Sequence, residues 1–261
     1  MRVGIAQMAS CSYKEKNIQK AIEMIRELSE GGAQLVLLPE LFNYLPPRIS
    51  LEAYKKNAEA LDGPTIAKLI DTAKDRGICI IAGSIIEKRA SGFSNTSCIV
   101  TPQGLGSCYR KMHLFKYGNI NEGQVFEAGD EPVVAELSGI NVGMTICYDL
   151  RFPELYRKEM LAGAEAITNV AAFLKETGRM HWMPLLRARA IENQVYMLAA
   201  NQASVEGNSP CYYGHSCVID PWGRIVARAD SEENVILADI SRNRVREVRE
   251  RLPALKSIRL I

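Results

Sequence analysis

Short apolar runs of strand length alternate along this chain with longer segments in which apolar residues recur at helical spacing. Residues 3–6 and 35–38 are two such runs, and Pro39 stops the second. Residues 14–30 lie between them and place apolar side chains on one face of a helix, at Ile18, Ile22, Ile25 and Leu28. The pattern therefore predicts a strand, a helix and a second strand at the start of the chain.

The same alternation continues through the rest of the sequence. Asp62-Gly63-Pro64 marks the start of a second helix, Gly77 ends it, and residues 78–82 form the next apolar strand. Further helices are predicted at roughly 153–162, 181–193 and 241–251, and further strands near 165–170 and 195–200.

Three pairs of strand-like segments are close enough along the chain to form hairpins. They are residues 97–101 with 107–110, 133–137 with 141–146, and 218–220 with 224–226. Strand–helix units mixed with hairpins predict an α/β architecture whose apolar strands are covered on both faces. Because no linker-like stretch divides the chain, we expect one domain over residues 1–261.

Composition and charge narrow the class of protein. Hydrophobic residues make up 47% and charged residues 24% of the chain, which is typical of a globular protein and argues against extensive disorder. The net charge of +2 gives no reason to expect a nucleic acid or an anionic membrane as partner. No uncharged apolar run approaches the roughly 18 residues that a membrane span needs.

The N-terminal residues and the cysteines indicate a compartment. Residues 1–7 contain one basic residue and a strand-length apolar run, without the features of a signal peptide. The seven cysteines are scattered and form no C-x-x-C pair, so we expect mostly reduced thiols in a cytoplasmic protein. The three histidines lie far apart in the sequence, and we expect no metal site.

Three chemically reactive residues follow predicted strands. Glu40 comes after the strand at 35–38, Lys111 ends the strand at 107–110, and Cys147 ends the strand at 141–146. The carboxyl ends of strands are where α/β sheets place their sites. Taken singly, each residue has an ordinary interpretation, as a solvated carboxylate, a surface lysine and a small buried hydrophobic residue.

The segments around these three residues resemble a known family. Leu38-Pro39-Glu40-Leu41-Phe42, Tyr109-Arg110-Lys111-Met112-His113-Leu114-Phe115 and Ile146-Cys147-Tyr148-Asp149-Leu150-Arg151-Phe152-Pro153-Glu154 are similar to the three signature blocks of the nitrilase (carbon–nitrogen hydrolase) superfamily, in the order of that family. Further similar segments, such as residues 181–193, extend the resemblance over essentially the whole chain.

The resemblance implies a fold, a site and an assembly. It implies a single-domain, four-layer αββα sandwich that acts without a metal or an organic cofactor and pairs into homodimers or larger assemblies. It also implies a catalytic triad of Glu40, Lys111 and Cys147. A second glutamate commonly joins this triad, and Glu122 is the matching position, with Glu127 as its competitor.

The chemistry of amide hydrolysis supports the same roles. The reaction needs a nucleophile, a base that returns a proton to the leaving amine, and donors for the developing oxyanion. Cys147 is the expected nucleophile and Glu40 the expected base. Lys111 and the backbone N–H of Tyr148 are the expected oxyanion donors, and Glu122 is expected to orient Lys111.

Within the superfamily, the sequence looks most like the omega-amidase and deaminated-glutathione amidase branch, which hydrolyses the terminal amide of a small 2-oxo acid. A carboxylate-bearing substrate requires cations or hydroxyl groups in its pocket. The candidate substrate-binding residues are Tyr44, Tyr148, Arg151, Phe173, Thr177 and His181. Three of them also have a simpler interpretation. Tyr44 and Phe173 could merely form walls of the pocket, and Arg151 could form an ion pair with Glu154.

Other functions remain open at this point. A nitrilase or an N-carbamoyl amine hydrolase would use the same triad, and a Cys–His acyl hydrolase would pair Cys147 with His113 or His181. A catalytically silent binding or scaffold protein would keep only the fold. The apolar C-terminal residues, Leu255 and 258–261, indicate either a subunit interface or a frayed end.

Overall fold

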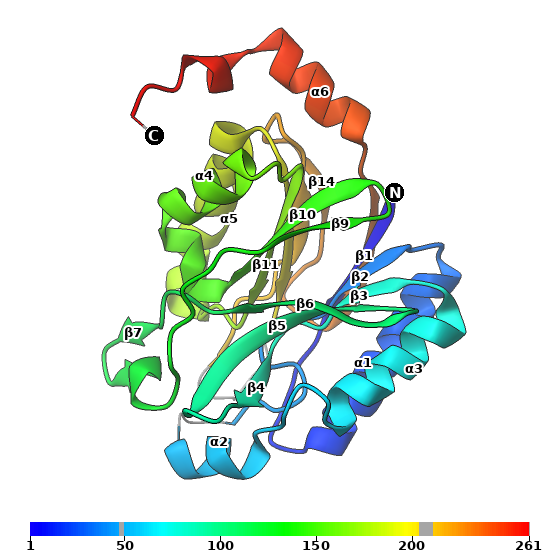
Figure 1. Ribbon diagram of the computed structural model, residues 1–261, viewed down its shortest axis with the longest axis vertical. Coiled ribbons are helices and arrows are strands. Elements are labelled where there is room, and N and C mark those ends of the chain that lie inside the picture. The colour runs from blue at the N-terminus through cyan, green and yellow to red at the C-terminus, as the bar shows by residue number, and fades with distance from the viewer. Residues whose placement is uncertain (47–49, 204–210, 261) are drawn as a thin grey trace.

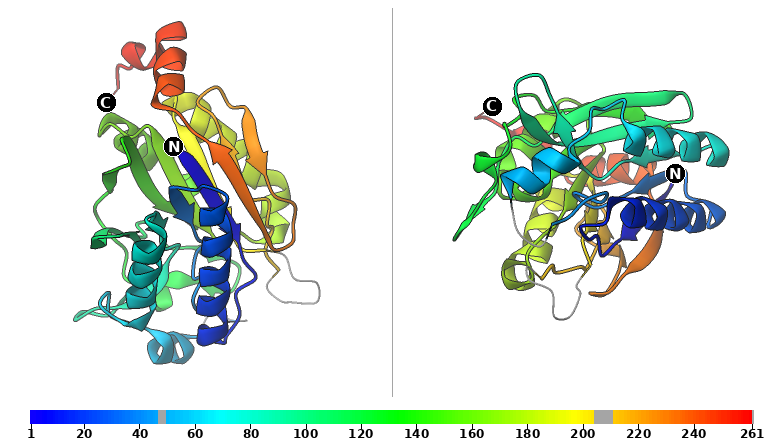
Figure 2. Two further views of the ribbon diagram at one scale, coloured as in Figure 1. Left: turned by 90° about the vertical axis from the view of Figure 1, so that its right-hand side faces the viewer. Right: turned by 90° about the horizontal axis from the view of Figure 1, so that it is seen from below.

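Two β-sheets lie face to face, and helices cover the outer face of each (Figure 1). The structure is a computed structural model that describes residues 1–46, 50–203 and 211–260. Views from two further directions show the helices on opposite sides of the paired sheets (Figure 2). The four-layer αββα sandwich implied by the resemblance is therefore confirmed.

The first sheet contains seven strands. Their order is β15 (Asn234–Asp239), β1 (Arg2–Gln7), β2 (Leu35–Leu37), β3 (Cys79–Ile81), β5 (Phe93–Thr101) and β4 (Ile85–Lys88), and β6 (Gly104–Arg110) also pairs with β5. Strands β1, β2 and β3 are parallel, as the predicted strand–helix–strand pattern requires. Their connecting helices, α1 (Lys14–Glu30) and α3 (Pro64–Arg76), pack on the outer face of this sheet.

The second sheet contains six strands. Their order is β14 (Ile225–Arg228), β13 (Cys217–Ile219), β12 (Tyr196–Asn201), β11 (Ala166–Ala171), β10 (Ile140–Ile146) and β9 (Val134–Leu137). Strands β10, β11 and β12 are parallel, and the helices α4 (Pro153–Leu161) and α5 (Lys175–Asn193) cover their outer face.

Smaller elements complete the described part of the chain. They are α2 (Leu51–Asn57), α6 (Arg242–Arg251), the two-stranded sheet of β7 (Lys116–Tyr117) and β8 (Ile120–Asn121), and the 3-10 helices η1 (Glu122–Gln124), η2 (Cys147–Arg151) and η3 (Ala254–Ser257). Across residues 1–46, 50–203 and 211–260, no helix is both long enough and apolar enough to cross a bilayer.

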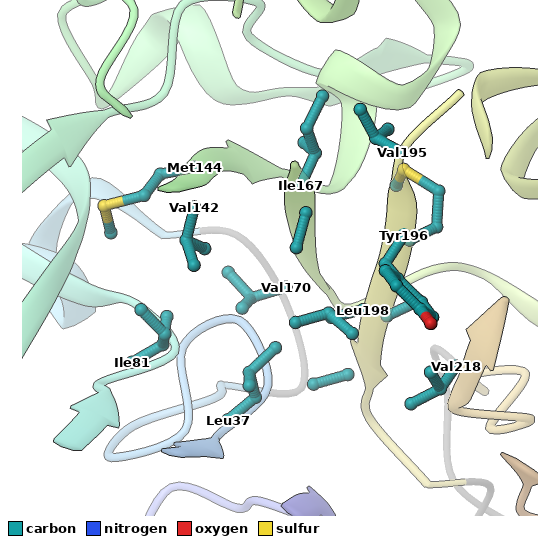
Figure 3. Close-up of a cluster of buried hydrophobic side chains, with 14 of the residues drawn as sticks. Leu37, Ile81, Val142, Met144, Ile167, Val170, Val195, Tyr196, Leu198 and Val218 are labelled. Carbon is teal, nitrogen blue, oxygen red and sulfur yellow. The ribbon is translucent and has the colours of Figure 1, made fainter. Parts of the chain in front are cut away.

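The alternation of side chains along the strands builds two cores. In β2, Leu35 and Leu37 face the second sheet, while Val36 and the following Leu38 face α1 and α3. Figure 3 shows Leu37 of the first sheet in one cluster with side chains from β10, β11 and β12 of the second sheet. Because β2 is buried on both faces, it reads in the sequence as a continuous apolar run.

The structure corrects several predicted boundaries. Helix α5 begins at Lys175 rather than near residue 181. The prediction missed its first turns because they contain Gly178, and glycine has a low helix propensity. A Cβ at this glycine would lie 2.5 Å from the side chain of Tyr213, so close packing explains why it is there. The connection predicted at 102–106 is also shorter, since β5 ends at Thr101 and β6 begins at Gly104.

The sequence pattern missed α2, β4, β15 and the strands β7 and β8. Strand β15 carries a short apolar run, residues 235–238, although most of its residues are exposed or half-buried, and it pairs with β1 along its whole length. At the C-terminus, Leu255 and Ile258 pack partly against the core between the sheets, whereas Leu260 is 98% exposed. Residue 261, also named in the predicted apolar tail, lies outside the described residues.

One glycine allows two loops to approach each other closely beneath the end of β2. Gly83 has a φ of +47°, and a Cβ built on it would lie 2.0 Å from the carbonyl oxygen of Pro39. This contact fixes the backbone immediately before Glu40.

We expect Gly83→Ala to lower the free energy of unfolding by more than about 2 kcal/mol, because it combines a left-handed backbone with a backbone clash. Urea unfolding measures this loss. Gly77→Ala is the matched control, because Gly77 also has a positive φ but has open space around it, so only the conformational cost of about 1–2 kcal/mol applies. Equal losses in the two variants would contradict the expectation.

Candidate active site

Three chain segments bring their reactive residues to one cavity. Glu40 follows β2, Lys111 follows β6 and Cys147 follows β10, and all three line a cavity of about 380 Å³. Their exposed fractions are only 2%, 1% and 7%. Glu40, Lys111 and Cys147 thus lie in one cavity although up to about a hundred positions separate them in the sequence. This agrees with the prediction from their places at the ends of strands.

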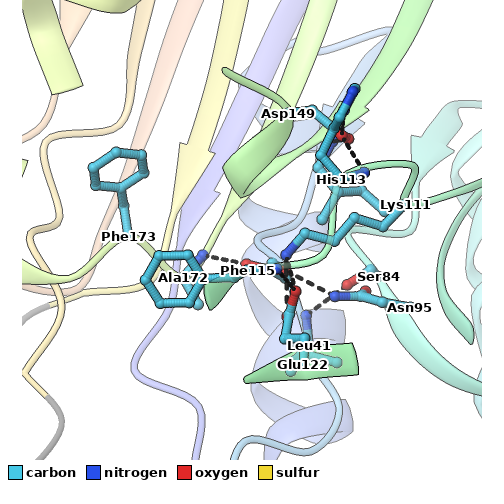
Figure 4. A network of polar contacts seen from close by, with 12 residues as sticks. Leu41, Ser84, Asn95, Lys111, His113, Phe115, Glu122, Asp149, Ala172 and Phe173 are labelled. Atoms are coloured by element: carbon cyan, nitrogen blue, oxygen red, sulfur yellow. Dashed lines mark hydrogen bonds and ion pairs between the residues drawn. The ribbon is translucent and has the colours of Figure 1, made fainter. Parts of the chain in front are cut away.

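Lys111 lies between two carboxylates. Its Nζ is 2.8 Å from Oε1 of Glu40 and 2.8 Å from Oε2 of Glu122 (Figure 4). Burial by itself lowers the pKa of a lysine, but the Glu122 and Glu40 carboxylates outweigh burial and raise the pKa of Lys111 well above its usual value. The ammonium group therefore stays charged.

Glu40 is fixed by donors from both sheets. Asn95 Nδ2 on β5 donates to its Oε1 at 2.8 Å, and the backbone N–H of Ala172, just after β11, donates to its Oε2 at 2.8 Å. Leu41 has a φ of +52° and donates its N–H to Ser84 Oγ, which turns the chain sharply after Glu40. Asn95 is not among the predicted site residues, because the predicted strand began only at residue 97, whereas β5 begins at Phe93.

Glu122, and not its competitor Glu127, lies beside Lys111. The Glu122 carboxylate also accepts the N–H of Phe115 at 2.7 Å. Burial raises the pKa of Glu122, Lys111 opposes this rise, and the nearby Glu40 adds to it. Glu127 instead accepts hydrogen bonds from Ser91 and Arg89 and is outside the described lining of the cavity.

Cys147 begins the 3-10 helix η2 with a φ of +47°, a conformation that non-glycine residues adopt rarely. Burial raises the pKa of its thiol well above the usual value, and Glu40 adds to the rise, whereas Lys111 and the Ala172 N–H lower the pKa. The cysteine is therefore protonated at neutral pH.

A buried aspartate connects the Cys147 turn to the end of β6. Asp149 accepts hydrogen bonds from the N–H of Ile146 at 2.9 Å, from the hydroxyl of Tyr109 at 2.7 Å and from the N–H of His113 at 3.0 Å. It thereby fixes the turn that carries Cys147 relative to the strand that carries Lys111. Asp149 belongs to the third sequence motif, but no role was predicted for it.

Four of the six predicted substrate-binding residues line the cavity, namely Tyr148, Arg151, Phe173 and Thr177. Tyr44 and His181 are not among the described lining residues; Tyr44 is buried beneath the cavity wall and His181 is exposed. Three further aromatic residues line the cavity and were not predicted to do so, namely Phe115, Tyr54 and Tyr212. Phe115 lies in the second sequence motif, whereas Tyr54 and Tyr212 lie in none of the three.

Arg151 presents a cation at this cavity. Its guanidinium lies over the rings of Tyr148 and Phe173, 5.8 Å and 5.3 Å from their centroids, and Nη1 is 3.2 Å from Nδ1 of His181. In the part of the chain that the structure describes, no carboxylate forms an ion pair with Arg151, so the pair with Glu154 that the sequence allowed is absent there. Arg151 is thus available to a negatively charged ligand.

The histidines do not complete a Cys–His pair in the described structure. His113 stacks on Phe152 with its Nδ1 2.7 Å from Asp149, and neither His113 nor His181 is among the described lining residues. Among residues 1–46, 50–203 and 211–260, no group of three His, Cys, Asp or Glu side chains is arranged to hold a metal ion.

Comparison with known proteins places the chain in a family. The carbon-nitrogen hydrolase family model matches residues 2–250. The deaminated glutathione amidase of Dictyostelium discoideum is 37% identical over 273 residues, covering 99% of this chain and 94% of that protein. The omega-amidase NIT2 of Xenopus tropicalis is 37% identical over 258 residues, covering 97% and 92%.

A solved structure agrees with these relatives. The crystal structure of Saccharomyces cerevisiae Nit3, a member of branch 10 of the nitrilase superfamily, has a TM-score of 0.89 and 32% identity, covering 97% of this chain and 94% of that chain. The resemblance that the three sequence motifs indicated is therefore confirmed. The chain belongs to the carbon-nitrogen hydrolase family.

Proposed function

We propose that this protein is an amidase that hydrolyses the terminal carboxamide of a small carboxylate-bearing 2-oxo acid to the acid and ammonia. The observation that carries the proposal is the buried Lys111 ammonium between Glu40 and Glu122, in the same cavity as Cys147. The relatives named deaminated glutathione amidase and omega-amidase support the class of substrate.

The first half of the reaction forms a thioester. Glu40 takes the proton of the Cys147 thiol as the sulfur attacks the amide carbon. The Lys111 ammonium and the backbone N–H of Tyr148 stabilise the oxyanion of the tetrahedral intermediate. Glu40 then gives its proton to the nitrogen, the carbon–nitrogen bond breaks, and ammonia leaves.

The second half hydrolyses the thioester. Glu40 takes a proton from a water molecule whose oxygen attacks the thioester carbon, and the same oxyanion donors act again. Collapse of this intermediate breaks the carbon–sulfur bond, returns the proton to Cys147 and releases the carboxylic acid. Glu122 positions Lys111 throughout, because it forms the second ion pair of the ammonium.

A cation in the cavity lining accounts for the choice of substrate. Arg151 is the lining cation without a carboxylate partner among the described residues, and Thr177 adds a hydroxyl group nearby. A guanidinium binds a carboxylate with two parallel hydrogen bonds. We infer that the substrate carboxylate binds Arg151 while the amide lies at Cys147.

The assembly and the compartment are also proposals. Large apolar side chains are exposed on the outer helices, with Leu161 on α4 at 52% and Met180 and Ile191 on α5 at 71% and 47%. These exposed side chains on two neighbouring helices support a homodimer that pairs through α4 and α5. The scattered, odd number of cysteines supports a reducing, cytoplasmic compartment.

A panel of small amides, nitriles and N-carbamoyl amines tests the activity by ammonia release. We expect turnover of 2-oxo acid amides, none in Cys147→Ala, and an acyl adduct on Cys147 by mass spectrometry. Release of carbon dioxide together with ammonia would instead identify a carbamoyl amine hydrolase, and turnover of nitriles alone would identify a nitrilase. A folded protein without activity on any of the three classes would refute the proposal.

Lys111→Ala is expected to lower kcat by a factor of about 100 or more, because it removes an oxyanion donor. Steady-state kinetics on the preferred amide measure the effect, and circular dichroism checks the fold. Lys68→Ala, which removes an exposed lysine, is the control and should retain wild-type kcat. A near-normal kcat in Lys111→Ala would rule out the role of Lys111.

The thiol of Cys147 is expected to lose its proton only at a pH well above the ordinary pKa of cysteine, because burial raises its pKa. A raised pKa keeps an acid protonated at neutral pH. The far-ultraviolet thiolate absorbance of the wild type minus that of Cys147→Ser should therefore be near zero at neutral pH and appear only in strongly alkaline solution. A thiolate difference at neutral pH would show that Glu40 is not needed as the base.

Arg151→Ala is expected to raise KM about 10- to 100-fold for an amide that carries a carboxylate, because a charge-assisted hydrogen bond contributes about 1.5–3 kcal/mol. For an uncharged amide of similar length, KM should change little. Arg179→Ala removes an exposed arginine that is outside the described cavity lining and is the control. Equal effects on both amides would argue against carboxylate recognition by Arg151.

A further inference from the structure

The hairpin of β5 and β6 carries two cysteines that face each other across the strands. Cys98 and Cys108 are register partners in the antiparallel ladder. Farther along the same register, the N–H of Lys111 donates to the carbonyl of Asn95 at 2.9 Å. Hydrogen-bonded and non-hydrogen-bonded pairs alternate, so Cys98 and Cys108 form a non-hydrogen-bonded pair. The Cα atoms of such a pair are about 4.5 Å apart, which is within the range that a disulfide spans.

The two thiols differ in their access to solvent. Cys98 is fully buried in the core between the first sheet and α3. Cys108 is half-buried and packs against the edge of the same core. A small solute in water can therefore reach Cys108, whereas Cys98 can react only with a group already inside the protein.

Their surroundings make Cys108 the more acidic thiol. Hydrogen bonding between the two side chains lowers the pKa of Cys108 and raises that of Cys98. Burial and the Glu87 carboxylate raise the pKa of Cys108, while the Arg110 guanidinium, two residues along β6, lowers it. Arg110 is itself fixed by two hydrogen bonds of 2.7 Å to Glu87. The net effect is a lowered pKa for the accessible thiol.

An accessible, acidic thiol beside a buried second thiol is the arrangement of a redox-sensitive cysteine pair. We propose that Cys108 and Cys98 are a modification site at which a hydroperoxide reversibly converts the dithiol to a cross-strand disulfide. The site is separate from Cys147 and lies on the α3 side of the first sheet.

The reaction balances with one hydrogen peroxide. The Cys108 thiolate attacks one peroxide oxygen, the O–O bond breaks, hydroxide leaves, and Cys108 becomes a sulfenic acid. The Cys98 sulfur then attacks the Cys108 sulfur, and the departing hydroxide takes the Cys98 proton as water. The proton first lost by Cys108 neutralises the other hydroxide, so two thiols and one peroxide give one disulfide and two waters.

The location connects this site to the catalytic residues. Lys111 directly follows β6, and Asn95 on β5 donates to Glu40. A bond between Cys98 and Cys108 would therefore constrain the two strands that position Lys111 and Glu40.

Peptide mass spectrometry on the full-length Cys147→Ala variant tests the site, since this variant removes the reactive thiol of the cavity. Trypsin releases residues 90–110 as one peptide that contains Cys98 and Cys108 and no other cysteine. After brief exposure to hydrogen peroxide and blocking of free thiols, we expect this peptide to be lighter by two hydrogens and unblocked. A thiol reductant should restore both blocking sites.

Two further variants in the same background separate the steps. With Cys98→Ala, a dimedone adduct should accumulate on Cys108, because no second thiol resolves the sulfenic acid. With Cys108→Ser, Cys98 should remain unoxidised. In the absence of peroxide, Cys108 should be alkylated at least about tenfold faster than Cys98.

Three outcomes would overturn the proposal. They are a peptide 90–110 that remains fully reduced while Cys79 or Cys217 is oxidised, a disulfide from Cys108 or Cys98 to another cysteine, and equal alkylation rates at Cys98 and Cys108.

Discussion

The buried ammonium of Lys111 is the feature around which the site is organised. Removing a charge from water costs several kcal/mol, and a buried ion persists only when its partners and hydrogen bonds compensate. Glu40 and Glu122 supply that compensation. Glu40 is in turn fixed by Asn95 of the first sheet and by the Ala172 N–H of the second. The ion cluster therefore joins the two sheets, in addition to the chemical role that we propose for it.

The charge balance in the cavity also bears on the proposed role of Cys147 as the nucleophile. One ammonium and two carboxylates leave a net charge of about one negative when all are ionised. A thiolate would add a second negative charge in a buried place, which explains the raised pKa of Cys147. In the proposed mechanism, transfer of the thiol proton to Glu40 during the attack means that the resting protein never carries this second negative charge. The Glu40 base is then as necessary to the mechanism as the Cys147 nucleophile.

The sequence predicted those parts of the structure that have strong local signals. Strand β2 appears as an apolar run because it is buried on both faces, and Glu40 comes shortly after it. Lys111 and Cys147 directly follow the strands β6 and β10. The first turns of α5 were not predictable, because the packing of Tyr213 on Gly178 is a contact between residues far apart in the sequence. Strand β15 did have a local signal, the apolar run at 235–238, which the prediction left unassigned. Within the site, the same limit applies to Asn95, Tyr54 and Tyr212, which reach the cavity only through the tertiary fold.

The pairing of β1 with β15 has a consequence for the making of this protein. Residues 2–7 leave the ribosome long before their partners at 234–239, so one edge of β1 stays open during most of the synthesis of the described chain. An open strand edge is a template for pairing with other chains. Domains generally fold as units during translation, and here the unit closes only when its final strand arrives. A nascent chain that stalls before residue 234 therefore has a first sheet with an unpaired edge strand, which is prone to aggregation and needs protection by chaperones.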